Sequence, residues 1–178
     1  MRGGVDAVQL RNKALPRVDL LSLAEQLARA CREAGSIFIV NDHLDVALLS
    51  DADGVHLGPD DLSVAGARRV AGASLLIGAS ASSPEAARQA EEEGADYLGS
   101  GPAYATPLKT EKKVIGPSGV AAVAAAVRIP VFAIGGIDQR RIPELKAAGV
   151  ERVCAIRSLA EGPEPEAVAR AFRDALLA

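Results

Sequence analysis

Short apolar runs rich in β-branched residues recur seven times along this 178-residue chain, with helix-like segments between them. None of these runs alternates cleanly between apolar and polar residues. Near-continuous apolar strands are typical of parallel sheets covered by helices, so the alternation predicts an α/β fold with parallel strands. The predicted strands are Ala7–Arg11, Ile37–Asn41, Gly54–Gly58, Leu75–Ser80, Tyr97–Gly101, Pro130–Gly136 and Arg152–Ile156.

The segments between these runs carry helix start and stop signals. We expect a helix from Asp19 to Ala34, capped by Asp19 or Ser22 and stopped by Gly35. Ser83-Pro84-Glu85 combines a capping residue, a proline at the first helical position and an acid in the first turn. Further helices are predicted from Pro117-Ser118 to Val127, from Asp138 to Ala148 and from Pro165 to Leu177.

One short sequence motif repeats along the chain: a helix end is followed by a glycine, an acid and then a strand. It occurs as Glu93-Gly94-Ala95-Asp96-Tyr97 and as Ala148-Gly149-Val150-Glu151-Arg152, and Gly3-Gly4-Val5-Asp6-Ala7 repeats it without a preceding helix. Seven visible units and one absent unit make eight. We therefore expect a TIM-type (β/α)8 barrel that lacks its first strand and helix, as a single domain over residues 1–178. A full barrel has about 250 residues, and one absent unit accounts for roughly thirty of the shortfall.

Composition excludes several classes of protein. A net charge of −3, with three Phe and two Tyr, argues against a nucleic-acid platform, which needs basic grooves and stacking aromatic residues. No apolar run approaches the roughly 18 residues of a membrane helix, and Asp6 stands where a signal peptide would be apolar. Cys31 and Cys154 are far apart in sequence, which favours reduced thiols. These features predict a cytoplasmic domain.

Polar side chains follow the first predicted strand. In a βα-barrel the chemistry collects at the carboxyl ends of the strands. Gln9, Arg11 and Lys13 alternate in sequence, so in a strand they face one side and offer two cations and an amide to an anion. The alternative interpretation is a solvated strand end.

Acids follow the next two predicted strands. Asn41-Asp42 ends one strand, and Asp60 and Asp61 follow the other. Two carboxylates on neighbouring strand ends are a predicted Mg²⁺ site, because Mg²⁺ prefers one or two protein carboxylates together with substrate phosphates. Asp60 or Asp61 could equally cap the helix that begins near Ser63. His43 and His56 have no second ligand at metal spacing, and we interpret both as structural or supporting residues.

The later strand ends indicate further anion binding. Ser80 follows Gly78-Ala79, and the long polar segment 102–117, with Lys109, Lys112 and Lys113, is typical of a functional loop. Gly135-Gly136 and Ile156-Arg157 follow the last two strands, where barrels often bind phosphate through backbone N–H groups.

Taken in order, these strand ends resemble the superfamily of thiamine-phosphate synthase and the thiazole tautomerase. The resemblance covers nearly the whole chain, and the ordered occurrence of its phrases is specific for the superfamily. The matching phrases are Val8-Gln9-Leu10-Arg11-Asn12-Lys13, Ile39-Val40-Asn41-Asp42, Asp53-Gly54-Val55-His56-Leu57-Gly58, Gly94-Ala95-Asp96-Tyr97-Leu98-Gly99 and Ala133-Ile134-Gly135-Gly136-Ile137.

The resemblance implies a Mg²⁺-dependent transferase that joins hydroxymethylpyrimidine diphosphate to a thiazole phosphate and releases diphosphate. It implies Arg11, Lys13 and Lys109 as catalytic residues and Asp42 and Asp61 as Mg²⁺ ligands. Departure of diphosphate leaves a cation that the thiazole nitrogen attacks, so no protein nucleophile is required. The implied substrate-binding residues are Gln9, Arg11, Asn12, Lys13, Asn41, Ser80 and Lys109 for the pyrimidine diphosphate and Thr106, Gly136, Ile156 and Arg157 for the thiazole phosphate.

Several positions depart from the family pattern. Asn12 stands where the family usually has Glu, Pro59 where it has Gln, Leu108 where it has a second Thr, and Arg157 where a small residue is usual. The tautomerase branch has a histidine at the position of Ser82, so tautomerase chemistry of that type is disfavoured.

Three hypotheses remain open from the sequence. The leading one is the synthase. The second is a tautomerase-like or regulatory barrel that binds thiazole phosphate or thiamine phosphate without synthase activity. The third is an inactive chain whose fold persists only in a homo-oligomer. In each case the expected partners are small phosphorylated molecules, with neither nucleic acid nor a membrane.

Overall fold

A computed structural model describes residues 1–105, 113–161 and 164–178. Within these ranges, strands and helices alternate along the chain, as the sequence predicts. The strands are β1 (Ala7–Leu10), β2 (Ile37–Asn41), β3 (Gly54–Leu57), β4 (Leu76–Ser80), β5 (Tyr97–Ser100), β6 (Val131–Ile134) and β7 (Val153–Cys154). The helices are α1 (Arg17–Ala34), α2 (Leu44–Leu49), α3 (Val64–Ala71), α4 (Pro84–Glu92), α5 (Gly116–Ala125), the 3₁₀ turn η2 (Gln139–Arg141), α6 (Ile142–Ala147), α7 (Arg157–Ala160) and α8 (Pro165–Leu177).

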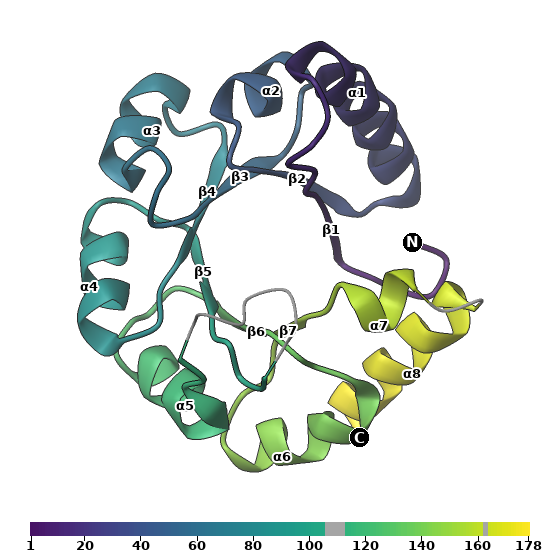
Figure 1. Ribbon diagram of the computed structural model, residues 1–178, viewed down its shortest axis with the longest axis vertical. Coiled ribbons are helices and arrows are strands. Elements are labelled where there is room, and N and C mark those ends of the chain that lie inside the picture. The colour runs from purple at the N-terminus through teal and green to yellow at the C-terminus, as the bar shows by residue number, and fades with distance from the viewer. Residues whose placement is uncertain (106–112, 162–163) are drawn as a thin grey trace.

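The seven described strands form one parallel sheet in the order β1-β2-β3-β4-β5-β6-β7. The sheet curls around a central axis, and the helices lie outside it as a ring (Figure 1). This is the TIM-like α/β fold that the sequence predicts, with the carboxyl ends of all described strands at one mouth.

The two faces of the sheet are both buried, which explains the near-continuous apolar runs. Val40, Val55, Ile77 and Leu98 are completely buried and belong to the main core cluster, which also contains residues of the surrounding helices. Their neighbours along each strand face the barrel interior. Of the two cysteines that were predicted to be reduced and buried, Cys31 is a buried thiol and Cys154 is half-buried.

The sequence signals for helix caps are confirmed only in part. Ser83 accepts a hydrogen bond from the Ala86 N–H at the start of α4, as predicted, whereas Ser63 caps α3, and not Asp60 or Asp61. The predicted cap of α1 is wrong, because that helix begins at Arg17, directly after Pro16. Pro16 occupies the N-cap position with an extended ψ of 150°, and its side chain offers no acceptor to the first-turn N–H groups.

The first residues of the chain pack against its last helix. A Cβ atom on Gly3 would lie 2.4 Å from the Glu166 carbonyl oxygen and 2.7 Å from Ala169 Cβ, so the segment lies directly on α8. Arg173 of α8 donates a hydrogen bond to the Gly4 carbonyl at 3.3 Å. The amino-terminal segment therefore lies along α8 just before the chain enters β1 (Figure 1).

Candidate active site

The ends of β1 and β2 bring a lysine and an aspartate together. Lys13 Nζ lies 3.7 Å from Asp42 Oδ2, with the aspartate side chain 16% exposed and the lysine side chain 66% exposed. Asp42 follows β2 with a φ of 67°, and its N–H donates to the His56 carbonyl at 2.8 Å. This bond to the neighbouring strand fixes the position of Asp42 at the mouth of the barrel.

Asp61 pairs with Asp42 from the loop after β3. Asp61 Oδ2 accepts a hydrogen bond from the Gly58 N–H at 2.7 Å, which holds the loop back against the strand end. Burial raises the pKa of Asp42, and so do a hydrogen-bonding contact with Asp61 and its negative charge, while Lys13 and Arg11 act in the opposite direction. Two neighbouring carboxylates that disfavour each other's charge are stabilised by a shared cation.

The donor set at this pair fits a magnesium ion. In the described ranges, no three His, Cys, Asp or Glu side chains gather as a metal site by themselves. Two carboxylates with the remaining positions open to water and phosphate are the arrangement that Mg²⁺ prefers. Asp42 and Asp61 are therefore the residues of this mouth that could hold it.

A band of polar side chains crosses the barrel interior below this pair. His56 shares a hydrogen bond through Nε2 with Ser80 Oγ at 3.0 Å and through Nδ1 with Tyr97 Oη at 3.2 Å. The Tyr97 hydroxyl also contacts the Gln9 side chain. Burial raises the pKa of Tyr97, so its hydroxyl stays protonated near neutral pH. The band links Gln9 on β1 to Ser80 on β4, two residues predicted to bind substrate.

Glycines make room for these rings. A Cβ atom on Gly78 would lie 2.1 Å from Tyr97 Cζ, and one on Gly99 would lie 3.2 Å from His56 Cε1. Tyr97 also meets Phe132 edge-on, with ring centroids 5.7 Å apart. The tyrosine can therefore cross the interior only because β4 carries no side chain at position 78.

Sequence reasoning did not identify Tyr97 as part of the site. The signal that could have found it is Gly78, because a glycine inside a strand often marks the close approach of another group. His56 was interpreted as structural or supporting, and its two side-chain bonds place it beneath Ser80 in that role.

The turn after β6 lies beside the start of α7. Gly136 has a φ of 66°, and Ser158 Oγ donates to the neighbouring Ile137 carbonyl at 3.0 Å. Ile156 is 53% exposed and Arg157 is half-buried at the first position of α7. Gly136 and the Ile156–Arg157 turn therefore lie on adjoining segments.

The remaining candidates lie in different settings. Asn41 is buried at the end of β2. Asn12 Oδ1 accepts hydrogen bonds from the N–H groups of Ala14 and Leu15, so this side chain shapes the loop after β1. Thr106, Leu108 and Lys109 lie outside the described residues.

A cavity of about 550 Å³ opens beside the ends of β4 and β5, lined by Ser82, Gly101, Pro102, Lys113, Val114 and Ile115.

Together, the TIM-like barrel, its cations and its paired carboxylates define the class of the protein. It is an α/β-barrel enzyme that acts on small molecules at the carboxyl ends of its strands. No helix in the described ranges has the length and apolar character needed to cross a membrane.

Comparisons with known proteins identify the family. The family described as thiamine monophosphate synthase matches residues 1–159. A thiamine-phosphate synthase of Chlorobium luteolum is 45% identical over 97% of this chain and 82% of the relative, and one of Prochlorococcus marinus is 42% identical over 97% of this chain and 49% of the relative. The structure of a thiamine phosphate pyrophosphorylase from Pyrococcus furiosus superimposes with a TM-score of 0.92 at 36% identity, covering 99% of this chain and 85% of that one. The chain belongs to the thiamine monophosphate synthase family, which confirms the resemblance seen in the sequence.

Proposed function

We propose that this chain is a thiamine-phosphate synthase, which joins hydroxymethylpyrimidine diphosphate to thiazole phosphate and releases diphosphate. The observation that carries the proposal is the pair of Asp42 and Asp61 beside Lys13 at the ends of β1 to β3. Two neighbouring carboxylates next to an exposed lysine suit a diphosphate bound through a metal ion. The relatives that bear the name thiamine-phosphate synthase support the same reaction.

In this proposal the first three strand ends hold the leaving group. Arg11 and Lys13 bind and neutralise diphosphate as negative charge grows on it. Gln9, whose side chain contacts the Tyr97 hydroxyl, and Asn41, buried at the end of β2, would help to hold the diphosphate. Asn12 remains in the candidate set through its loop position between Arg11 and Lys13.

Asp42 and Asp61 would hold Mg²⁺ in the proposed enzyme. Bound there, the ion supplies neutralisation of the leaving diphosphate. The ion pair with Asp42 would keep the Lys13 ammonium beside the diphosphate.

The second substrate would lie toward the later strands. Gly136 and the Ile156–Arg157 turn would bind the thiazole phosphate, with Thr106 and Lys109 completing the two substrate sites from the segment after β5. Ser80 is positioned by its bond to His56. The attacking atom is the thiazole nitrogen, so the protein needs to orient and neutralise, and no covalent intermediate with a side chain is formed.

The alternative function is a tautomerase-like or regulatory barrel that binds thiazole phosphate or thiamine phosphate without synthase activity. Ser82, at the position of the tautomerase histidine, lines the cavity of about 550 Å³ beside the site. Histidine exchanges a proton near neutral pH, whereas a serine hydroxyl does not. Ser82 therefore cannot take the acid–base role of the tautomerase histidine, which favours the synthase.

The test is release of diphosphate from hydroxymethylpyrimidine diphosphate with thiazole phosphate and Mg²⁺ present. Turnover that depends on both substrates and is lost with a chelator supports the proposal. Tight binding of thiazole phosphate without turnover would instead establish the alternative. Loss of Mg²⁺-dependent turnover in Asp42→Ala and in Asp61→Ala supports the metal assignment, and its survival in either variant would refute it.

The proposal includes the setting of the enzyme. We take residues 1–178 as one barrel domain that acts on phosphorylated small molecules in the cytoplasm, without a nucleic-acid partner. Association into a homo-oligomer is tested by solution mass. A stable active monomer would remove the idea that the fold depends on an oligomer.

A further inference from the structure

Arg141 lies at the end of η2, just after the glycine turn that follows β6. Its NH1 group donates a hydrogen bond to the Gly136 carbonyl. Its guanidinium carbon lies 4.3 Å from the centroid of the Tyr104 ring, and its Nε lies 3.9 Å from Asp138 Oδ2. One side chain thus contacts both the turn after β6 and the segment after β5.

Tyr104 is itself fixed on both sides. Its Oη donates to Glu144 Oε2 at 2.9 Å, and its N–H donates to the Gly135 carbonyl at 3.1 Å. Burial together with the bond to Glu144 raises the pKa of Tyr104 to about 12. The ring is therefore a fixed surface against which the Arg141 guanidinium stacks.

The glycine turn is held at two carbonyl oxygens, at Gly135 by the Tyr104 N–H and at Gly136 by Arg141. Gly135 and Gly136 have φ angles of 92° and 66°, and glycine has the widest conformational freedom of any residue. A Cβ atom on Gly136 would lie 2.7 Å from the Ala105 carbonyl oxygen, so the turn and the segment after β5 touch directly. The Arg141 guanidinium donates to the Gly136 carbonyl and stacks on the Tyr104 ring. It therefore fixes the turn after β6 against the segment after β5.

We propose that Arg141 is a positioning residue, which holds the Gly135–Gly136 turn in the conformation that receives the phosphate of the thiazole substrate. The identity of that phosphate rests on the proposed function. Arg141 acts through the Gly136 backbone and does not touch the reacting atoms. A purely structural arginine would affect stability, whereas a positioning arginine affects the binding of one substrate.

The test compares Arg141→Gln with Arg140→Gln. Both variants remove one positive charge from η2, but Arg140 is 92% exposed and pairs only with Asp138 at 3.9 Å in the described part of the chain. We expect Arg141→Gln to raise KM for thiazole phosphate about tenfold, which corresponds to about 1.4 kcal/mol. KM for hydroxymethylpyrimidine diphosphate should stay within about twofold, and both constants should be unchanged in Arg140→Gln.

A binding measurement separates this inference from the proposed function. In chain labelled with ¹⁵N-glycine, inorganic phosphate should shift the Gly136 amide resonance, and about tenfold more phosphate should be needed in Arg141→Gln. If the chain makes no thiamine phosphate, the proposed function fails and this titration alone decides the role of Arg141. Equal phosphate affinity in the Arg141→Gln and Arg140→Gln variants would overturn the inference.

Arg141→Lys keeps the inference testable if the glutamine variant does not fold. Lysine retains the charge and has three N–H donors, but it lacks the planar guanidinium that can stack on the Tyr104 ring. We expect a phosphate affinity between those of the wild-type chain and Arg141→Gln. An affinity equal to that of the wild-type chain would show that the guanidinium geometry does not position the turn.

Discussion

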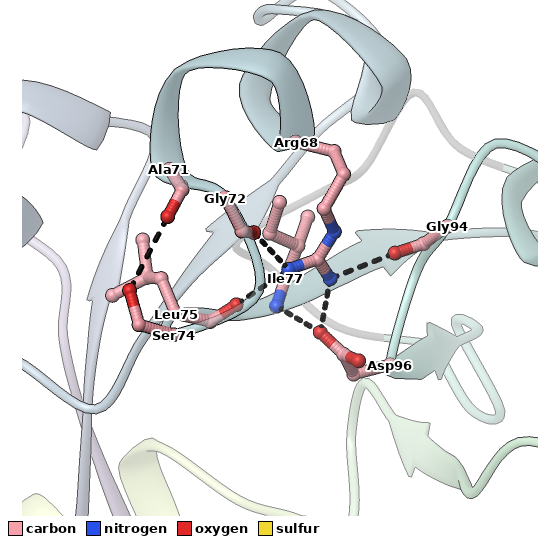
Figure 2. A network of polar contacts seen from close by, with 8 residues as sticks. All are labelled: Arg68, Ala71, Gly72, Ser74, Leu75, Ile77, Gly94 and Asp96. Carbon is pink, nitrogen blue, oxygen red and sulfur yellow. Dashed lines mark hydrogen bonds and ion pairs between the residues drawn. The ribbon is translucent and has the colours of Figure 1, made fainter.

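Asp96 ties two strands and a helix together at the amino-terminal end of the barrel (Figure 2). Its Oδ2 accepts hydrogen bonds from the Ile77 N–H at 2.7 Å and from Arg68 NH2 at 2.5 Å. Arg68 also donates to the carbonyl oxygens of Gly72, Leu75 and Gly94 at 2.8 to 2.9 Å. Asp96→Ala should therefore remove a carboxylate on which both a strand N–H and the arginine depend.

The expected loss of stability follows from two contributions. Ile77 is completely buried, and leaving its N–H without a partner costs about 1–3 kcal/mol. The Arg68–Asp96 ion pair is partly exposed, which limits it to about 1 kcal/mol or less. Together they predict a loss of about 1–4 kcal/mol, or a fall in Tm of about 2–16 °C for a chain of this size.

Asp53 provides the matched control. It accepts a hydrogen bond from the Phe38 N–H at 2.7 Å at the start of β3, and no arginine pairs with it among the described side chains. Asp53→Ala should therefore cost only the first contribution, and Asp96→Asn only the second. Urea unfolding followed by circular dichroism measures all three variants. If Asp96→Ala costs less than about 1 kcal/mol, or no more than Asp96→Asn, the carboxylate does not secure the Ile77 N–H and the reasoning fails.

Three further variants test the site. The raised pKa of Asp42 means that its charged form destabilises the metal-free fold above that pKa, so Asp42→Asn should stabilise the chain near neutral pH by about 0.5 kcal/mol in urea unfolding. The same change should lower Mg²⁺-dependent diphosphate release about 100-fold, and a destabilised variant with full turnover would contradict the paired-carboxylate site. Gly78→Ala should cost about 3 kcal/mol, because its Cβ atom would meet Tyr97 Cζ at 2.1 Å, and an unchanged Tm would refute that contact. Gly136→Ala should raise KM for thiazole phosphate about tenfold or more, since its φ of 66° and the Ala105 carbonyl both oppose a side chain, whereas equal effects on both substrates would argue against a phosphate at this turn.

The order of elements was predictable because each signal is local. Apolar runs bounded by glycine and proline locate the strands, and the parallel arrangement then brings every strand end to one mouth. This is why Lys13, Asp42 and the Asp60–Asp61 pair could be placed at one mouth from local signals, while the family resemblance singled out Asp61. The short helices α2 and α7, of six and four residues, contain too few turns to show a helical period and were not predicted.

The contacts inside the barrel could not be predicted in the same way. Tyr97, His56 and Gln9 meet across strands that are far apart in sequence, and no local pattern records which side chains share the interior. The role of Arg141 has the same origin. Its partners Gly136 and Tyr104 come from two different strand ends, and only the fold brings them together.

The close fit of Gly78 beneath Tyr97 constrains how this sequence can change over evolutionary time. A side chain at position 78 and a large ring at position 97 exclude each other, since the two would occupy the same volume. Substitutions at the two positions should therefore covary among natural variants, with a residue larger than glycine at 78 found only where 97 is small. Any such lineage would also give up the hydroxyl that joins Gln9 to His56.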